Sequence, residues 1–464
     1  MKRSQWFPTL LSVLSSLTFA LPSSIDPRAA AWPDTPFTVS GRDIISASGT
    51  KVRFAGVNWP GAADTMLPEG FQHNSIANIV SFIKSLNMNV VRLTYAIETI
   101  DDIFSNSPDQ SLEKTLTRAL GEANGEKVLE QVLKNNPGFT KDTTRLQVFD
   151  TVAAELAKQK IWVHLDNHVS KAKWCCGSDG NGWFGDLFFD VAKWERGLGY
   201  MANHAKSWTG LTSMSLRNEL REPHSIAAQR YTWNTWINNV IPAANGIHSN
   251  NSAPLIFFSG QNYDTDDTYF IQRQTWHGAT FKPESYAFKN KIVYEMHNYQ
   301  NGAKNCNRIL PDLYNYAYCA MNATDSKCPN HGPVVMSEFG FDQNDGSLGR
   351  AYAQCIKKFI REQPGGPGGW MMWTLSGSDY IRSGKQETED PWGLLNKDWS
   401  GWRNSPVIKY YVKPFVQATL GWKLVEVKRS SRDDTLVLKL PTILMCSVEI
   451  AMQGLLTPSR GKPA

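Results

Sequence analysis

The stretch from Met214 to Pro223, MSLRNELREP, decides the fold. It begins as the end of a buried strand and then places Asn218 and Glu219 side by side, without a hydrophobic partner to cover them. A strand that ends in Asn-Glu sets a carboxyl group at the mouth of a sheet, with an amide beside it to fix its angle. The stretch 333–340, PVVMSEFG, repeats this pattern with Glu338. Two strand-end glutamates so far apart in sequence converge only where a fold gathers strand ends into one ring, and the parallel (β/α)8 barrel does this.

The rest of the chain supplies the segments that such a ring needs. Apolar runs with polar ends predict eight strands, at residues 52–59, 89–95, 161–168, 213–219, 255–260, 292–297, 333–338 and 369–375. The spacing of apolar residues predicts helices between most of them, at residues 74–86, 145–158, 188–208, 227–240, 349–361 and 408–418. A strand, a helix and a parallel strand form the right-handed unit of α/β folds. We therefore predict an α/β fold, a (β/α)8 TIM barrel over residues 51–421.

Residues 96–144 interrupt this alternation. They contain two polar helical patterns, at 112–120 and 127–133. We interpret the segment as an elaborated loop on the C-terminal side of the strands, where such barrels carry their specificity.

The two ends of the chain depart from the barrel pattern. Residues 1–20 combine a basic start, a short apolar stretch and small residues up to Ala20, which is typical of a signal peptide. We therefore expect a secreted, extracellular protein, with residues 21–50 as an N-terminal lead-in. Residues 422–464 are basic and aperiodic, and we expect a poorly ordered tail. The sequence has no other long apolar run, so we expect no membrane anchor.

Composition limits the classes of partner. The chain has 464 residues, of which 41% are hydrophobic and 20% are charged, which suits one large core. The formal net charge of +5 is spread thinly, without a basic stripe, so the charge does not favour nucleic acid. The chain is rich in aromatic residues, which serve either a large core or the stacking of sugar faces. We expect a monomer.

The seven cysteines favour disulfides over a metal site. They are Cys175, Cys176, Cys306, Cys319, Cys328, Cys355 and Cys446. No C-x-x-C pair is present, which disfavours zinc, and a secreted protein meets an oxidising compartment. The odd number leaves at least one cysteine unpaired or paired with another chain. Sequons at Asn250 and Asn322 also fit secretion.

Polar or aromatic residues gather at the C-terminal ends of the predicted strands. They are Arg92, His168, Asn218, Glu219, His297, Tyr299, Glu338 and Trp373. Each alone has a structural interpretation, such as a hydrogen-bonded core histidine or a core tryptophan. A purely structural origin would scatter them over both ends of the strands. Their common position predicts one active site.

A pair of carboxyl groups suits the hydrolysis of glycosidic bonds. One must be protonated to help the leaving oxygen depart, and the other must be ionised to attack the anomeric carbon. We assign Glu219 as the acid/base and Glu338 as the nucleophile. For a mechanism that retains the anomeric configuration, their carboxyl groups are expected about 5–5.5 Å apart.

The neighbouring residues have supporting roles in this hypothesis. Asn218 would hold the 2-hydroxyl of the sugar, and Arg92 would keep Glu338 ionised. Tyr299 would donate a hydrogen bond to Glu338, and Trp373 would form the floor beneath the sugar. The two histidines, His168 and His297, would position the substrate or tune the acid. Aromatic residues in the predicted loops are candidates for stacking on further sugars, although loop packing explains each of them equally well: Trp59, Trp183, Phe184, Tyr263, Tyr380 and Trp392.

On these residues the chain resembles glycoside hydrolase family 5, the cellulase family of retaining (β/α)8 enzymes. The resemblance runs from about Val52 to Leu420, and the eight strand-end positions agree with that family in type and order. It implies Glu219 as acid/base, Glu338 as nucleophile, no metal and no organic cofactor. Many members continue Asn-Glu-Pro, whereas this chain reads NELREP at 218–223. With the motifs WCC at 174–176 and EMH at 295–297, it resembles a branch found in fungi and plants.

The substrate that the resemblance implies is a β-linked polysaccharide or oligosaccharide, with endo-β-1,4-glucan as the leading choice. Alternatives on the same scaffold are a β-mannanase, a β-1,3/1,6-glucanase and a glycolipid glycosidase. A carbohydrate-binding barrel without turnover is a further alternative.

Overall fold

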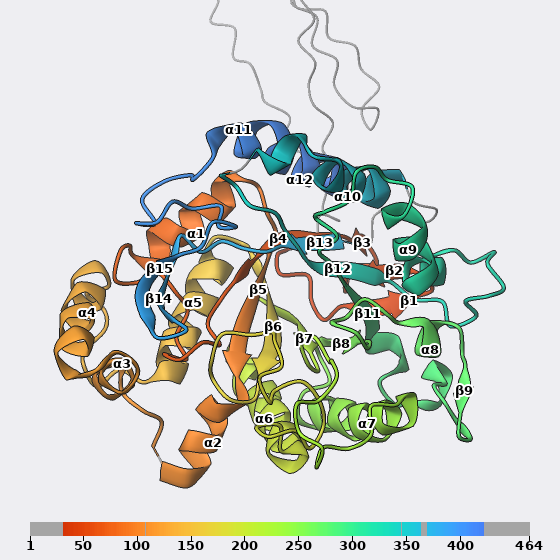
Figure 1. The fold of residues 1–464 in the computed structure, drawn as a ribbon, viewed down its shortest axis with the longest axis horizontal. Helices are drawn as coiled ribbons and strands as arrows, with labels where there is room; N and C mark the ends of the chain where they lie inside the picture. The colour runs from red at the N-terminus through yellow and green to blue at the C-terminus, as the bar shows by residue number, and fades with distance from the viewer. Residues whose placement is uncertain (1–30, 107, 345, 363–368, 422–464) are drawn as a thin grey trace, which may run out of the picture.

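Eight parallel strands close into a barrel, as predicted (Figure 1). The computed structural model describes residues 31–421, except 107, 345 and 363–368. Around the barrel the strands are β4 (Phe54–Trp59), β5 (Val90–Ala96), β6 (Trp162–Val169), β7 (Leu211–Ser215), β8 (Leu255–Ser259), β11 (Ile292–Asn298), β12 (Val334–Phe339) and β13 (Gly369–Met372). Because β13 pairs with β4, the ring has no open edge.

Helices surround this ring on the outside (Figure 1). They are α1 (Ile76–Ser85), α2 (Ile97–Asn106), α3 (Leu112–Leu120), α4 (Glu122–Asn135), α5 (Arg145–Lys158), α6 (Val191–His204), α7 (Trp233–Asn250), α8 (Thr268–Ile271), α9 (Ile309–Tyr316), α10 (Ala351–Glu362), α11 (Ser405–Val407) and α12 (Lys413–Leu420). The segment 96–144, predicted as an elaborated loop, forms α2, α3 and α4.

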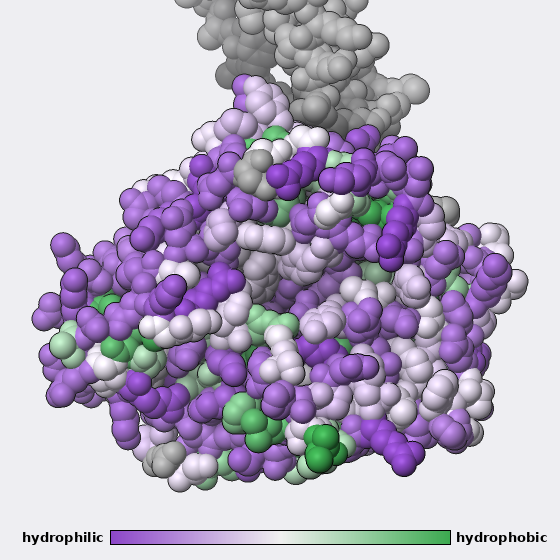
Figure 2. Space-filling view, viewed as in Figure 1, coloured by the Kyte–Doolittle hydropathy of each residue, from purple (hydrophilic) through white to green (hydrophobic). Residues whose placement is uncertain are grey.

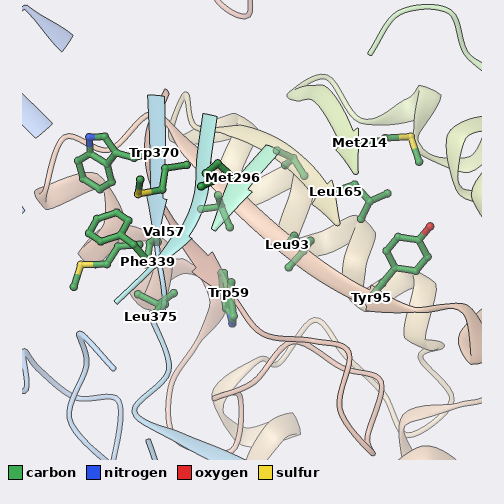
Figure 3. Packing of buried hydrophobic residues seen from close by; sticks show 14 of the residues in the cluster. Val57, Trp59, Leu93, Tyr95, Leu165, Met214, Met296, Phe339, Trp370 and Leu375 are labelled. Atoms are coloured by element: carbon green, nitrogen blue, oxygen red, sulfur yellow. The ribbon is translucent and has the colours of Figure 1, made fainter. Parts of the chain in front are cut away.

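The main core lies between the strands and this shell of helices. Side chains alternate along each strand, so every second residue points outward into the core. Met214 on β7 and Met296 on β11 belong to this outward set, as Figure 3 shows together with Leu165 and Trp370. On each strand, the residues that alternate with this outward set point into the barrel, and they supply the polar groups described below.

The lead-in closes the opposite end of the barrel from the candidate site. Strands β1 (Thr38–Ser40), β2 (Asp43–Ile45) and β3 (Lys51–Val52) form a small antiparallel sheet. Phe37 and Ile44 pack against Phe54, Val90 and other residues at the beginnings of the barrel strands. The predicted signal peptide at residues 1–20 and the tail at 422–464 lie outside the described residues.

The predicted end of strand β7 and the predicted start of helix α7 are wrong. Strand β7 ends at Ser215 rather than Glu219, because Asn218 N–H donates to the carbonyl of Asn167 and Glu219 has a φ of 46°, which leaves the extended conformation. Helix α7 begins at Trp233 rather than residue 227, because the Thr232 side chain caps it there. Short antiparallel strands outside the barrel were not predicted: the sheet of β1, β2 and β3, the pair of β9 (Thr275–Trp276) with β10 (Ala279–Thr280), and the pair of β14 (Ser378–Arg382) with β15 (Lys385–Glu389).

Six of the seven cysteines form disulfides, in agreement with the expectation. The pairs are Cys175–Cys176, Cys306–Cys355 and Cys319–Cys328, and Cys446 lies outside the described residues.

Hydrophilic residues dominate the face in Figure 2, and hydrophobic ones form small separate groups. Over the described part of the chain, no helix combines the length and the apolar character needed to cross a bilayer.

Candidate active site

The candidate site lies at the C-terminal ends of the barrel strands, where period-two alternation turns polar side chains inward. On β6 the inward residues are His164, Asp166 and His168, and on β11 they are Glu295 and His297. All are buried, so each needs a polar partner inside the barrel. This need explains the dense hydrogen-bond network beneath the site.

Arg92 on β5 is the centre of this network. Its Nη1 donates to Glu338 Oε1 at 2.5 Å and to Asn58 Oδ1 at 2.9 Å. Its Nη2 donates to Asn218 Oδ1 at 2.8 Å and lies 2.9 Å from Asp166 Oδ1. Burial alone would lower the pKa of Arg92, but the surrounding carboxylates outweigh burial and raise it. The guanidinium is therefore a permanent charge that holds Glu338 and Asn218 in place.

Glu338 receives hydrogen bonds on both carboxylate oxygens. Arg92 occupies Oε1, and the Tyr299 hydroxyl donates to Oε2 at 2.9 Å. Burial, followed by the charge of Glu338, raises the pKa of Tyr299 well above its usual value, so the phenol keeps the proton that it donates. Both oxygens of Glu338 are therefore held in a fixed direction by donors.

Glu219 has a different surrounding. Its Oε1 accepts a hydrogen bond from His297 Nδ1 at 3.1 Å, and its backbone N–H donates to Asp264 Oδ2 at 2.8 Å. Burial lowers the pKa of His297, but Glu338, Glu219, Glu295 and Asp264 outweigh it and raise the pKa well above the usual value. His297 therefore carries two ring protons near neutral pH.

The two glutamates lie close enough to act on one bond. A carboxylate oxygen of Glu219, one of Glu338 and a ring nitrogen of His297 all lie within 4.8 Å of one another. His297 Nδ1 is 3.8 Å from Glu338 Oε2, so the imidazolium lies beside both carboxylates. One oxygen of each glutamate is therefore within reach of a single glycosidic bond, and the carboxyl separation of about 5–5.5 Å stays a prediction.

A buried relay supports His297 from below. His297 Nε2 donates to the Ser337 hydroxyl, which donates to Glu295 Oε1 at 2.6 Å. Hydroxyls of Ser215 and Ser259 donate to the other oxygen of Glu295. Burial raises the pKa of Glu295, but Arg92 and His297 outweigh this effect and lower it, so Glu295 is an anion.

His168 and Asn218 border the site on the β6 side. His168 Nδ1 lies 2.7 Å from Asp166 Oδ2, and its ring stacks on Trp373, with 5.4 Å between the ring centroids. His168 Nε2 lies 3.2 Å from Cys175 Sγ. Asn218 Nδ2 lies 3.5 Å from Cys176 Sγ. The disulfide of these adjacent cysteines therefore touches two predicted site residues.

A cavity of about 460 Å³ opens above these groups, a size that suits a small-molecule ligand. Its lining includes the predicted residues His168, Glu219, Tyr299, Glu338 and Trp373. Arg92, Asn218 and His297 contact these residues from below, so the structure brings all eight predicted residues into one network. The remaining lining residues are Trp174, Cys175, Cys176, Asn262, Tyr263, Thr265, Arg382, Asp390 and Trp392.

The prediction of sugar stacking is wrong for four of the six aromatic residues. Trp59 and Trp183 are fully buried, and their indole N–H groups donate to the carbonyls of Glu69 and Arg230. Phe184 and Tyr380 are buried as well. In Figure 3, Trp59 belongs to the packed cluster around the strands. No sugar can reach these rings, whereas Tyr263 and Trp392 line the cavity and remain candidates.

Several polar residues of the site were not among the predicted ones. Asp166 and Glu295 each stand two residues before a predicted histidine on the same strand, so the period-two pattern that selected the histidine also points to them. Asn58 ends β4 in the same way as the predicted residues. Asp264 lies in an irregular loop, where no periodicity indicates its direction.

Two groups of described residues have the spacing of metal ligands, but neither suits a metal ion. In His168, Cys175 and Cys176 the sulfurs form a disulfide, whereas metals bind thiolates. In Glu219, His297 and Glu338, both ring nitrogens of the histidine already have protein partners, Glu219 and Ser337.

Comparison with known proteins places this arrangement in a family. The chain is 33% identical over 421 residues to a glycosyl hydrolase 5 family protein of Chamaecyparis obtusa, over 86% of this chain and 68% of that protein. It is 21% identical to the major extracellular endoglucanase of Xanthomonas campestris, over 83% of this chain and 72% of that protein. Its fold is similar to that of an endocellulase from Pyrococcus horikoshii in complex with cellotetraose, with a TM-score of 0.58, 18% identity and coverage of 83% of this chain and 100% of that one.

The model of the cellulase family, glycosyl hydrolase family 5, matches residues 45–376. This span contains all eight strand-end residues, including the two glutamates that face each other across the cavity. The chain belongs to glycosyl hydrolase family 5 and is a glycosidase.

Proposed function

We propose that the protein is a secreted, retaining β-glycosidase that cleaves a β-linked glucan, with endo-β-1,4-glucanase activity as the leading assignment. The observation that carries this proposal is that two glutamates in one cavity have different hydrogen-bond donors. Glu338 accepts from Arg92 and Tyr299 on its two oxygens, as an ionised nucleophile requires. Within the described part of the chain, Glu219 has one side-chain donor, His297, which leaves its other oxygen to exchange a proton with the leaving oxygen.

The mechanism follows from these positions. Glu338 attacks the anomeric carbon while Glu219 protonates the departing oxygen, and a glycosyl–Glu338 ester forms. Glu219, now ionised, removes a proton from water, which attacks the same carbon and releases Glu338. Arg92 neutralises the carboxylate that is regenerated in this second step. Asn218, held by Arg92, offers its Nδ2 to the 2-hydroxyl of the sugar.

The relatives support the choice of substrate, and the sequence and the disulfides support the location. The similar proteins named above are an endoglucanase and an endocellulase that binds cellotetraose, which favours β-1,4-glucan. Secretion is supported by the signal-peptide pattern at residues 1–20 and by three disulfides, which form in oxidising compartments.

A second candidate is cleavage of a single terminal glucose, from a chain end or from a non-carbohydrate aglycone. The specific observation is the contact between Trp174 and Arg382, with the guanidinium carbon 3.3 Å from the ring centroid. Trp174 follows β6, Arg382 ends β14 in the hairpin after β13, and both line the cavity, so their contact joins these two loops along one side of it. A long glucan that must pass this side would be blocked.

A substrate panel tests both candidates. Carboxymethyl cellulose, mixed-linkage glucan, laminarin, mannan, xylan and aryl β-glycosides are incubated with the wild-type protein, and the products are followed by viscosity and by chromatography. Internal cleavage lowers viscosity early, whereas terminal cleavage releases glucose alone. A folded wild-type protein without turnover of any substrate contradicts the proposed function.

Azide rescue tests the roles of the glutamates. Glu338→Ala is expected to lose hydrolysis and to form an α-glycosyl azide when azide is added, because azide attacks from the face that Glu338 occupied. Glu219→Ala is expected to form the β-glycosyl azide from an activated aryl glycoside, because azide replaces water in the second step. Interchanged products would overturn the assignment.

A further inference from the structure

We propose that the disulfide between Cys175 and Cys176 is part of the substrate-binding surface, and that it aligns the amide of Asn218 with the 2-hydroxyl of the reacting sugar. This inference rests on the proposed glycosidase function and extends it to residues for which that function alone predicts no role. Both cysteines line the cavity that Glu219 and Glu338 face.

The position of this disulfide is not explained by stability. A disulfide stabilises a fold mainly by closing a loop of the unfolded chain, and the effect is smallest for the shortest loop. Cys175 and Cys176 are adjacent in sequence, whereas the other pairs close separations of 49 and 9 residues. Because this pair constrains so little of the unfolded chain, we attribute to it an effect on the side chains that it contacts in the folded protein.

The contact with Asn218 shows what that effect is. Arg92 Nη2 donates a hydrogen bond to Asn218 Oδ1, so the amide can rotate only in ways that keep this hydrogen bond. Its Nδ2 lies 3.5 Å from Cys176 Sγ and 3.8 Å from Cys175 Sγ. A disulfide sulfur is a weak acceptor and has no hydrogen to donate. The disulfide therefore holds the NH2 group in place without saturating it, and a sugar hydroxyl can accept from the same group.

The disulfide also contacts the other side of the site. Cys175 Sγ lies 3.2 Å from His168 Nε2, and the His168 ring stacks on Trp373, the proposed floor beneath the sugar. Sulfur is apolar and polarisable, so it suits the C–H groups of a sugar ring better than a hydroxyl or an amide would. The pair thus forms a wall between the proposed floor and the Asn218 amide.

The test compares two substrates with two variants. The variant Cys175→Ala/Cys176→Ala removes both sulfurs from the cavity. The substrates are an aryl β-glycoside that the wild-type protein turns over and the matched compound without the 2-hydroxyl on the reacting sugar. For the complete substrate, kcat/KM is expected to fall by about tenfold to hundredfold, because a misplacement of about 1 Å costs on this scale. For the 2-deoxy substrate the fall is expected to be much smaller.

The matched control is Cys319→Ala/Cys328→Ala, which also removes one disulfide but lies away from the cavity. It is expected to lower Tm and to leave the ratio of kcat/KM for the two substrates at the wild-type value. An unchanged ratio in a folded Cys175→Ala/Cys176→Ala protein, or equal losses on both substrates, would overturn the inference.

Reduction of the wild-type protein gives a second measurement that needs no variant. Dithiothreitol breaks the Cys175–Cys176 bond, each sulfur gains a proton, and dithiothreitol becomes its cyclic disulfide. Both cysteines of this pair are partly exposed, whereas Cys319 and Cys328 are buried and the Cys306–Cys355 pair is partly exposed at Cys306 alone, so mild treatment is titrated until Cys175 and Cys176 react first. Peptide mapping after alkylation identifies the reduced pair. Reduction is expected to lower the ratio of kcat/KM for the complete substrate to kcat/KM for the 2-deoxy substrate, as in the Cys175→Ala/Cys176→Ala variant. Oxidation by oxidised glutathione is expected to restore this ratio.

The two proposals fail in different ways. A wild-type protein that turns over no glycoside contradicts the glycosidase mechanism, and the inference falls with it. The wild-type protein could instead turn over aryl glycosides while neither reduction nor substitution changes the ratio of kcat/KM for the complete and the 2-deoxy substrate. That result overturns the role of the disulfide alone.

Discussion

The carboxylate of Asp264 accepts a hydrogen bond from the backbone N–H of Glu219, with 2.8 Å between Oδ2 and N. Glu219 has a φ of 46°, in the left-handed region that residues other than glycine rarely adopt. The carbonyl of Asp264 also accepts from the backbone N–H of His297 at 2.8 Å. One buried residue therefore ties the backbone of the proposed acid/base to that of the histidine beside it, and stabilises a conformation that costs free energy on its own.

The first prediction concerns Asp264. In Asp264→Ala the Glu219 backbone loses its acceptor, and kcat for an aryl β-glycoside is expected to fall by about a hundredfold, the scale of a 1 Å displacement of a catalytic group. Burial raises the pKa of Asp264 well above its usual value, and asparagine has nearly the same size and shape. Asp264→Asn keeps an acceptor oxygen and is expected to lose much less activity. Equal losses in folded alanine and asparagine variants would contradict this role.

The glutamates were predictable from sequence and Asp264 was not, for a physical reason. Glu219 and Glu338 follow buried apolar strands, and parallel strands of a barrel end on one face. That rule needs no knowledge of the loops. Asp264 lies in the loop after β8, 45 residues beyond its partner, and its direction depends on several left-handed residues, Asn262 to Asp264. Neither periodicity nor composition records such a loop.

The aromatic residues illustrate the same limit. Trp59 and Trp392 both lie beside polar residues at strand ends or in loops, so the sequence treats them alike. In the structure the Trp59 indole turns into the core, where the carbonyl of Glu69 satisfies its N–H, whereas Trp392 lines the cavity. The adjacent cysteines are similar: composition predicts disulfides, but only the folded loop shows that Cys175 pairs with its neighbour.

The second prediction concerns Tyr299, whose hydroxyl donates to Glu338 Oε2. Tyr299→Phe removes this donor and leaves the ring in place. We expect kcat to fall by about 10²-fold, as for the loss of one preorganised donor at a site of changing charge. The control is Tyr410→Phe, at an exposed tyrosine on the outer surface. Wild-type kcat in Tyr299→Phe would show that the hydrogen bond does not act on the reaction.

The third prediction is the effect of pH through His297. Burial lowers the pKa of this histidine, but Glu338, Glu219, Glu295 and Asp264 raise it well above the ordinary value of 6.5. A raised pKa in the folded state means that folding favours the imidazolium. Its contribution to stability is therefore fully present below the unfolded pKa of 6.5 and is lost as pH rises through the folded pKa.

Comparison with His297→Gln measures this contribution. The free energy of unfolding in urea is determined for both proteins at a series of pH values from 6.5 upward. The advantage of the wild-type protein is expected to be largest at the lowest of these values and to shrink as the pH rises. An advantage that stays constant or grows with pH would mean that the folded protein does not hold the extra proton on His297.

The last prediction concerns the closed side of the cavity. Arg382 stacks on Trp174, and its Nη1 lies 3.6 Å from Asp379 and 3.6 Å from Asp390. Burial, followed by the charge of Asp390, raises the pKa of Asp379 to about 8, and Arg382 opposes this rise. The arginine is therefore held both by an aromatic face and by two acids behind it. A lysine could not replace the flat stacking contact.

Arg382→Ala is expected to open the cavity on this side. If the Trp174–Arg382 contact limits the substrate to one terminal glucose, the variant will gain internal cleavage of soluble glucans, seen as a faster fall in viscosity for each reducing end released. The control is Lys385→Ala, at an exposed residue of the same hairpin, which is expected to keep the wild-type ratio. A wild-type ratio in a folded Arg382→Ala protein would mean that the contact sets no limit on chain length. The choice between terminal and internal cleavage would then lie with other lining residues, of which Tyr263 and Trp392 are the aromatic candidates.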